Sequence, residues 1–246
     1  MINWGDSKPC HKNNTRMLNV RSVPWDLRDI LTASLLLVVG MLILIIALIP
    51  ISRYGGLTSA PLVCTGLAMT SVMLLAVSWF FGPLKHHVSI TSWGLRQPLV
   101  SGMSAFTLPV VILVVILTFN ALYGWVTSEL GWGILEPSNA FLDADYGPYS
   151  LTIIGILVIL IGPFAEEVFF RGFFLPGIAQ SWGPKAGIIT SALLFSLAHG
   201  EIALMIPISV AGLLLGWLYV RTDSLVMSFI VHSLQNTVAF GVTIIT

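Results

Sequence analysis

The chain has 246 residues, of which 56% are hydrophobic and only 9% are charged, and its formal net charge is zero. With a mean hydropathy of +0.93, it lies outside the usual range of soluble domains and is expected to be an integral membrane protein. Binding to nucleic acid depends on clustered Lys and Arg, and the 11 basic residues here are scattered, which argues against such a partner. The two cysteines, Cys10 and Cys64, form no disulfide framework or metal-spaced set, so both are expected to be free thiols.

The apolar runs predict the membrane-spanning segments, because a helix needs about 20 mostly apolar residues to cross a bilayer. Five separate runs meet this length, and the nearly unbroken apolar region 186–220 is long enough for two spans, one of them short. We therefore predict an all-α polytopic membrane protein, a helical bundle of about seven transmembrane helices, or eight if region 186–220 is more broken. The five separate runs are Ile30–Ile51, Pro61–Phe81, Phe106–Trp125, Leu151–Leu175 and Leu225–Ile245.

The basic residues predict the orientation, since cytosolic loops carry the excess of Lys and Arg. With the N-terminus in the cytosol, all 11 except Arg53 fall on the cytosolic side. The loop 126–150, which has four acidic residues and no basic ones, then falls outside. We predict a polar cytosolic segment over residues 1–28 and a transmembrane domain over residues 29–246, embedded in the cell (plasma) membrane with the N-terminus cytosolic.

A polar segment, residues 85–97, separates the second and third predicted spans. Its adjacent histidines, His86 and His87, are poorly placed to converge on one metal ion, so we interpret it as an interfacial segment anchored by Trp93 and Arg96. Other tryptophans lie near the ends of predicted spans, as in the aromatic belts of membrane proteins. These are Trp79, Trp125, Trp182 and Trp217.

Glutamates and an arginine interrupt the apolar run 151–175, where an ionisable side chain costs about 2.5 to 3.5 kcal/mol on insertion scales. Neighbouring helical residues point in different directions, so Glu166 and Glu167 cannot face the same group. Glu167 and Arg171, at i,i+4, lie on one face. We predict that Glu167 pairs with Arg171, which leaves Glu166 to face another group.

Two more pairs repeat the i,i+4 spacing: Phe195 with His199, and His232 with Asn236, whose side chains could donate to a single oxygen. If the fourth and fifth spans form an antiparallel hairpin, the midpoint between positions 166 and 199 falls at Trp182-Gly183, where glycine and proline favour a turn. Glu166 and His199 should then lie at matching depths. Single polar residues in membranes are often interhelical contacts worth about 1 kcal/mol, but this set at a common depth favours a functional site.

Three motifs, Glu166-Glu167-x-x-x-Arg171, Phe195-x-x-x-His199 and His232-x-x-x-Asn236, follow one another on the last membrane helices. In this order they resemble the CAAX protease and bacteriocin-processing (CPBP) family, which includes the type II CAAX prenyl proteases. The resemblance covers roughly residues 151–246, with all three motifs intact. The first 150 residues resemble the family only in being hydrophobic and helical. What the resemblance implies is an intramembrane endopeptidase with its catalytic motifs in 151–246.

The resemblance also implies roles for the motif residues. In similar proteins the first glutamate, here Glu166, acts with the second-motif histidine, here His199, to activate a water for attack on the scissile carbonyl. His232 and Asn236 would then stabilise the oxyanion, as preorganised donors do in dry sites. Supporting roles would fall to the remaining charged residues of the first motif, Glu167 and Arg171.

A metal is the main alternative for this chemistry, because the family is often labelled metalloprotease. Glu166, His199 and His232 would form a two-histidine, one-carboxylate zinc set. The chain has no His-Glu-x-x-His motif, and the metal-free mechanism gives Asn236 a role. We therefore favour a reaction without a metal or other cofactor and keep zinc as the alternative.

The expected partners are the membrane lipid bilayer and a membrane-bound or lipidated protein or peptide substrate, whose sequence and prenylation cannot be read from the chain. A second hypothesis is a non-catalytic protein for bacteriocin self-immunity or a membrane scaffold, since similar proteins have been tied to such roles. A transporter with a proton relay is a third. It is disfavoured because the chain lacks the internal repeat of many secondary transporters.

Overall fold

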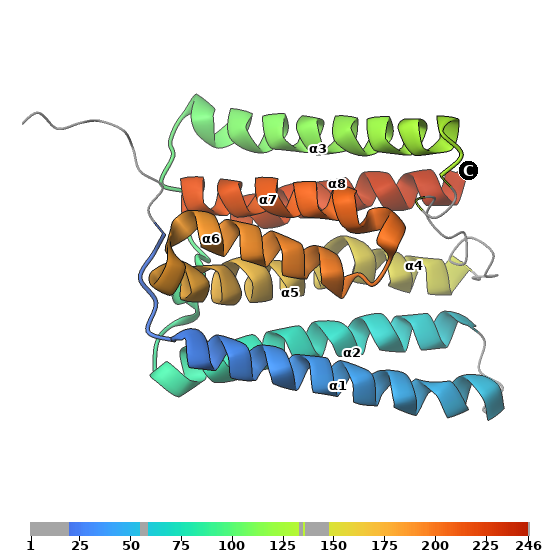
Figure 1. The fold of residues 1–246 in the computed structure, drawn as a ribbon, viewed down its shortest axis with the longest axis horizontal. Helices are drawn as coiled ribbons and strands as arrows, with labels where there is room; N and C mark the ends of the chain where they lie inside the picture. The colour runs from blue at the N-terminus through green and yellow to red at the C-terminus, as the bar shows by residue number, and fades with distance from the viewer. Residues whose placement is uncertain (1–19, 55–58, 133–134, 136–147, 246) are drawn as a thin grey trace, which may run out of the picture.

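The computed structural model describes residues 20–54, 59–132, 135 and 148–245, and it shows a bundle of helices (Figure 1). Six helices are long and apolar enough to cross a membrane, and no strand occurs in the described ranges. The predicted all-α membrane fold is therefore confirmed. The α-helices are α1 (Leu27–Tyr54), α2 (Ser59–Trp79), α3 (Met103–Glu129), α4 (Pro148–Ile156), α5 (Gly162–Glu167), α6 (Leu175–Ala198), α7 (Met205–Thr222) and α8 (Leu225–Ile245).

Shorter segments of other helical types connect or interrupt these helices. Two π-helices, η5 and η6, lie between α4 and α6, and a third, η1, extends α2. Their bounds are η1 (Phe80–Leu84), η5 (Leu157–Ile161) and η6 (Val168–Phe174), and the 3-10 helices are η2 (Ile90–Trp93) and η7 (Ile202–Leu204). The predictions for Cys10, for most of the segment 1–28 and for most of the loop 126–150 lie outside the described residues, whereas Cys64 is a free thiol.

The longest apolar helix, Tyr149–Ala198, has 50 residues, more than twice the roughly 20 that a bilayer requires. It is interrupted at Gly183, whose φ of 82° and ψ of 166° are not helical, and Pro184 follows. Figure 1 shows the chain turning back at this point, so that most of α6 runs beside α5 in the opposite direction. Divided at Gly183, the six long helices give seven apolar segments, of which the arm from Pro184 to Ala198 is the shortest, so the predicted count of about seven is close.

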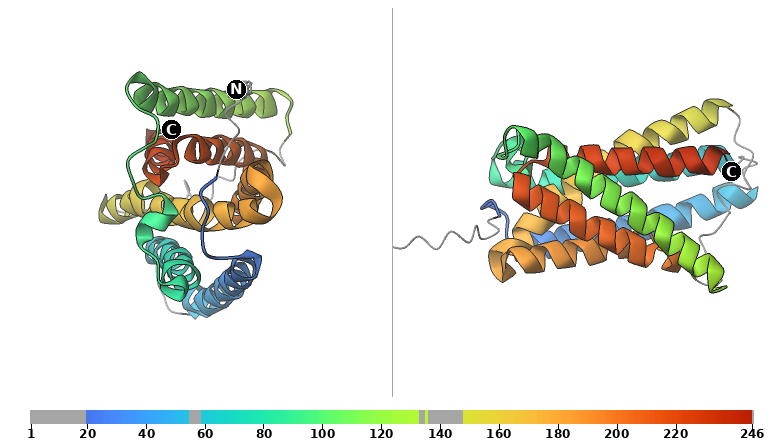
Figure 2. Two further views of the ribbon diagram at one scale, coloured as in Figure 1. Left: turned by 90° about the vertical axis from the view of Figure 1, so that its left-hand side faces the viewer. Right: turned by 90° about the horizontal axis from the view of Figure 1, so that it is seen from above.

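The helices stack in layers, which Figure 2 shows in its end-on view. Helix α3 forms one outer layer against α7 and α8, and α7 and α8 pack against α6 and α5. Helices α1 and α2 cover the other side, with α2 against α5 and α1 against α2 and α6. All three sequence motifs therefore lie on the two middle layers, on α5, η6, α6 and α8. A site built there is surrounded by protein on both sides.

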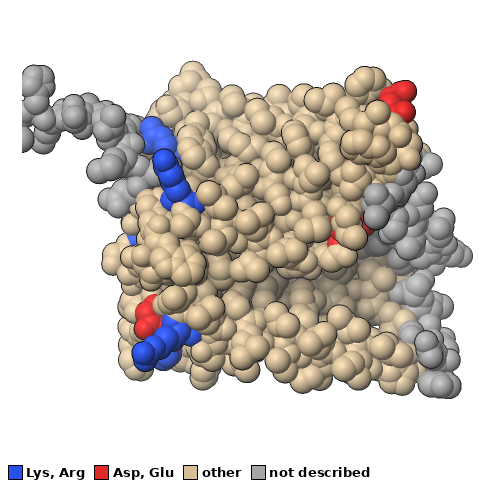
Figure 3. All heavy atoms as spheres, in the orientation of Figure 1, with Lys and Arg blue, Asp and Glu red and all other residues tan. Residues whose placement is uncertain are grey.

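Lys and Arg gather at one end of the bundle, which we call the basic end. It is the end where α1 begins, α6 turns back and α7 leads into α8, and Figure 3 shows the visible basic side chains there. Arg21 and Arg96 both pair with Asp223, the former at 3.1 Å. Lys85 and His86 both contact the buried carboxylate of Asp29, with His86 Nε2 at 2.8 Å. Ion pairs thus join chain segments that are distant in sequence.

The segment 85–97 packs into the bundle at this end, with Trp93 only 6% exposed. Tyr219 donates a hydrogen bond to the backbone oxygen of Trp93 at 3.3 Å. A Cβ atom at Gly172 would meet the Trp93 Cβ at 2.9 Å, so the glycine provides the space for this approach. Trp93 therefore anchors the segment through contacts inside the bundle, and Arg96 is exposed and reaches Asp223. The interfacial position of the segment stays a prediction.

Candidate active site

The charged residues of the first motif form a fully buried pair. Arg171 Nη1 donates to Glu167 Oε1 at 2.6 Å, and both side chains are 0% exposed. Arg171 Nη2 also donates to the Gly212 carbonyl on α7 at 3.4 Å. The predicted Glu167–Arg171 pair is therefore present. It lies at the junction of α5 with the π-helix η6, a distortion that occurs frequently at functional sites.

His232 on α8 links this buried pair to Glu166, the other glutamate of the first motif. Its Nδ1 lies 2.9 Å from Glu167 Oε1, and its Nε2 lies 3.6 Å from Glu166 Oε2. Because a carboxylate oxygen only accepts, Nδ1 carries the proton and donates to Glu167. The buried ion pair therefore fixes the ring orientation of His232 and directs Nε2 towards Glu166, as orienting carboxylates do for other histidines.

The two glutamates of the motif differ in accessibility. The side chain of Glu166 is 23% exposed, whereas that of Glu167 is completely buried. The separation of 3.6 Å between Glu166 Oε2 and His232 Nε2 is too long for a direct hydrogen bond. Glu166 is thus the carboxylate that an incoming molecule can reach, and Glu167 is the one that holds the site together.

Phe195 on α6 is the packing centre of the site. Its ring centroid lies 4.9 Å from that of His199 and 5.5 Å from that of His232, both in edge-to-face arrangements. The Arg171 guanidinium carbon lies 4.4 Å from the same ring centroid, in the range of a cation–π interaction. One ring therefore contacts a residue from each of the three motifs. The sequence had marked Phe195 only through its spacing to His199, and the central role was missed.

His199 ends α6 and is exposed. Its Nδ1 lies 2.8 Å from the backbone oxygen of Phe195, so Nδ1 donates and Nε2 carries the free lone pair. Both site histidines are therefore held through Nδ1. The expected partnership of His199 with Glu166 is not seen as a direct contact, since the described residues include no ion pair between the two within 4 Å; the joint role in activating water stays a prediction.

Helix α8 is attached to the π-helix η5 by two side chains beyond His232. Asn236 Nδ2 donates to the Val158 carbonyl at 2.9 Å, and Ser233 Oγ donates to the Ile159 carbonyl at 2.7 Å. One amide hydrogen of Asn236 is thereby used, which leaves the second for another acceptor. The role of Asn236 towards an oxyanion stays a prediction. Ser233 was missed because an isolated serine in a span carries no signal of its own.

The alternative zinc set does not fit this arrangement. Within the part of the chain that the structure describes, no three His, Cys, Asp or Glu side chains are grouped so as to hold a metal ion. Glu166 and His232 lie near one another, but His199 does not complete a three-ligand group with them. We therefore derive no step through a metal.

Known proteins support the resemblance seen in the motifs. Residues 148–238 match a family model described as "Type II CAAX prenyl endopeptidase Rce1-like", and this segment contains all three motifs. The chain is also 26% identical over 173 residues to the UPF0177 protein YxdF of Lactococcus lactis subsp. lactis (strain IL1403). The aligned region covers 69% of this chain and 89% of that relative. No solved structure matches the chain. The predicted resemblance is confirmed: residues 148–238 are similar to this family.

Proposed function

We propose that this chain, whose residues 148–238 match the Rce1-like model, is an intramembrane endopeptidase in which Glu166 is the general base. The observation that carries the proposal is the arrangement around His232. One ring nitrogen is held by the buried Glu167–Arg171 pair, and the other faces the accessible carboxylate of Glu166. A pair that only clamped helices would not need a second, accessible carboxylate beside the same ring.

The separation between Glu166 and His232 suits a shared water or substrate oxygen. A polar contact longer than about 3.5 Å is commonly bridged by water, and the two atoms here are 3.6 Å apart. Glu166 would take a proton from the bridging water while the oxygen attacks the scissile carbonyl carbon. The same carboxylic acid would then give that proton to the leaving amine, so that cleavage of the peptide bond consumes one water.

The remaining residues act on the oxyanion and the water. The two carboxylates and one guanidinium leave one negative charge, which a protonated His232 would balance, and its Nε2–H would then donate to the oxyanion. Asn236 would add its second amide hydrogen. His199, held at Nδ1 by the Phe195 carbonyl, would accept from the water at Nε2 and so orient it towards the substrate.

We also propose the setting of the reaction. The basic end would face the cytosol, because the excess of Lys and Arg marks the cytosolic side, and the chain would lie in the plasma membrane. The substrate would be a membrane-bound or lipidated protein, with a prenylated CAAX-type protein as the class that the matched model's description names. Its lipid would keep the scissile bond near the membrane surface.

The test is Glu166→Gln, which keeps the shape of the side chain and removes the base. Purified protein in proteoliposomes would be assayed with libraries of prenylated and unmodified peptides, read by mass spectrometry. Glu166→Gln should lower turnover by about 10² to 10⁴, the usual contribution of a general base, with an unchanged melting temperature. Glu129→Gln, an exposed change at the end of α3, is the matched control and should retain turnover.

Undiminished cleavage by Glu166→Gln would contradict the assignment of the base. Under the alternative function, as a non-catalytic immunity or scaffold protein, no peptide is cleaved by any variant and the cellular phenotype survives Glu166→Gln. The two hypotheses therefore predict different results both for peptide cleavage by the purified protein and for the cellular phenotype of Glu166→Gln.

A further inference from the structure

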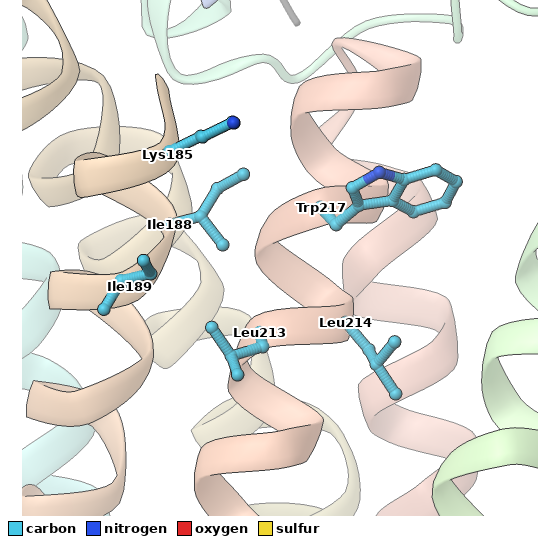
Figure 4. Close-up of a pocket in the computed structure, with 6 residues that line it drawn as sticks. All are labelled: Lys185, Ile188, Ile189, Leu213, Leu214 and Trp217. Atoms are coloured by element: carbon cyan, nitrogen blue, oxygen red, sulfur yellow. The ribbon is translucent and has the colours of Figure 1, made fainter. Parts of the chain in front are cut away.

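A groove of about 360 Å³ lies between α6 and α7, on the outside of the bundle and away from the motif residues (Figure 4). Its walls are isoleucine and leucine side chains, with one cation and one indole. In Figure 4, Lys185 and Trp217 lie towards one end of the groove, and Leu213 and Leu214 lie towards the other. The lining residues are Lys185, Ile188, Ile189, Leu213, Leu214 and Trp217.

The charged end of the groove coincides with the basic end of the bundle. Lys185 follows the turn at Gly183, and Trp217 lies in the last turns of α7, which ends at Thr222. Lys185 is exposed, and the described residues offer it no carboxylate within 4 Å. This differs from Lys85 and Arg96 at the same end, which are both paired with aspartates. Lys185 is therefore free to bind an anion at the level of lipid headgroups.

We propose that this groove binds an anionic phospholipid, with the phosphate at Lys185 and an acyl chain along the wall formed by Ile189 and Leu213. A lysine stem packs along apolar surface while its ammonium stays at the interface, and tryptophan is favoured at the same depth. The Trp217 indole N–H is a further donor for a headgroup oxygen. The proposal is independent of proteolysis, because none of the lining residues belongs to the motifs.

Charge distinguishes this occupant from the others that an apolar groove could take. A second copy docking about a two-fold axis would bring the same face, and therefore the same Lys185, to both sides of the contact. The lipid of a prenylated substrate carries no charge, so Lys185 would contribute nothing to its binding. An anionic phospholipid uses both the cation and the apolar wall, and each interfacial Lys favours anionic lipid by about 1 kcal/mol.

The experiment uses the whole chain in vesicles and the fluorescence of Trp217. The vesicles would consist of phosphatidylcholine with increasing fractions of a lipid that carries brominated acyl chains, which quench tryptophan on contact. This brominated lipid is phosphatidylglycerol in one series and phosphatidylcholine in the other. The quenching of Trp217 is obtained as the difference between the quenching of the unmodified chain and that of the Trp217→Phe variant. We expect brominated phosphatidylglycerol to occupy the groove about fivefold more than brominated phosphatidylcholine does, because one interfacial cation favours an anionic lipid by about this ratio.

Lys185→Gln should reduce this preference to about one, because the neutral amide keeps the groove and removes the charge. Arg28→Gln is the matched control, since Arg28 is an exposed cation at the start of α1 that does not line the groove. It should leave the preference unchanged.

Three results would overturn the proposal. Equal quenching by both lipids would show ordinary boundary lipid, and equal losses in Lys185→Gln and Arg28→Gln would show a general surface potential. Displacement of the brominated lipid by a short peptide with a prenylated cysteine, unaffected by Lys185→Gln, would identify a substrate lipid as the occupant. A melting temperature equal to that of the unmodified chain establishes that each variant is folded.

Discussion

The middle layers and the α1–α2 pair are both apolar, but they differ in how much of their apolar surface is buried against protein. In the helix Tyr149–Ala198, half of the most apolar window is buried inside the protein, whereas in α1 and in α2 the share is 17%. Glu167, Arg171 and His232 of the site are buried. Charged groups in a membrane are tolerated where protein surrounds them and supplies partners, so the enclosed layers can hold a reaction site and the exposed pair cannot.

The segment that matches the family model is the one that carries the enclosed site. The matched segment, residues 148–238, begins at α4 and ends within α8. A buried site needs specific side chains at specific positions, while a helix facing lipid needs only apolar ones. Most of the predictions below contrast an enclosed position with an exposed one.

The largest effect is expected from Arg171→Met, which leaves the buried Glu167 carboxylate without its main partner. Removing one member of a buried ion pair typically costs about 3 to 5 kcal/mol. Thermal unfolding in detergent should show a strongly lowered melting temperature. The double variant Glu167→Met/Arg171→Met buries no charge of the pair and should recover much of the loss. Equal melting of the single variant and the unmodified chain would contradict a structural role for the pair.

A matched pair of glycines gives the next contrast. At Gly172 a Cβ atom would lie 2.9 Å from the Trp93 Cβ and 3.0 Å from Leu225 Cδ1, whereas nothing lies within 4 Å of a Cβ at Gly66. Gly172→Ala should destabilise by about 1 to 3 kcal/mol through overpacking. Gly66→Ala should be neutral or slightly stabilising, because alanine is the better helix former. Similar melting temperatures for both variants would mean that Trp93 can move away.

Helix α8 offers a smaller contrast between two hydroxyl groups. Ser233 donates across the bundle to the Ile159 carbonyl at 2.7 Å, while Thr243, which is half-buried, donates to the Ala239 carbonyl of its own helix at 3.0 Å. Side-chain hydrogen bonds between membrane helices average about 0.6 kcal/mol. Ser233→Ala should therefore lower stability by about that amount, and Thr243→Ala should not. Denaturant titration in mixed micelles measures both, and a larger loss from Thr243→Ala would reverse the assignment.

The sequence predicted the features that depend on length and periodicity. A bilayer fixes the length of an apolar run, so the last span, Leu225–Ile245, matches α8 at both ends. The i,i+4 spacing identified the Glu167–Arg171 pair, and the midpoint of the hairpin located the turn at Gly183. Each of these follows from the geometry of one helix or of two antiparallel ones.

The features that were missed depend on contacts between segments that are distant in the sequence. The contact of His232 with both glutamates requires α8 to lie against α5 at one particular rotation, which no spacing within α8 specifies. The π-helices shift the register without changing composition, so their positions leave no pattern in the sequence. Burial of Trp93 depends on the space left by Gly172 in a different helix. Reasoning from spacing within one helix therefore identified the residues of the site and the Glu167–Arg171 pair, but not the contacts of His232 and Trp93 with other helices.

The smallest effect is expected from Leu42→Ala on α1, where the leucine is 54% exposed. Lipid tails are as apolar as leucine, so helices in a membrane associate through van der Waals packing and not through the hydrophobic effect. A leucine that faces lipid makes few packing contacts with protein, so its truncation should change stability little. The change in unfolding free energy should stay within about 0.5 kcal/mol, the usual limit for surface substitutions. Leu215→Ala, at a fully buried position of α7, should by contrast cost about 2 to 5 kcal/mol. If denaturant titration gave Leu42→Ala a loss as large as that of Leu215→Ala, α1 would be in contact with protein along this face, and its exposure to lipid would have to be replaced by an interface with another chain.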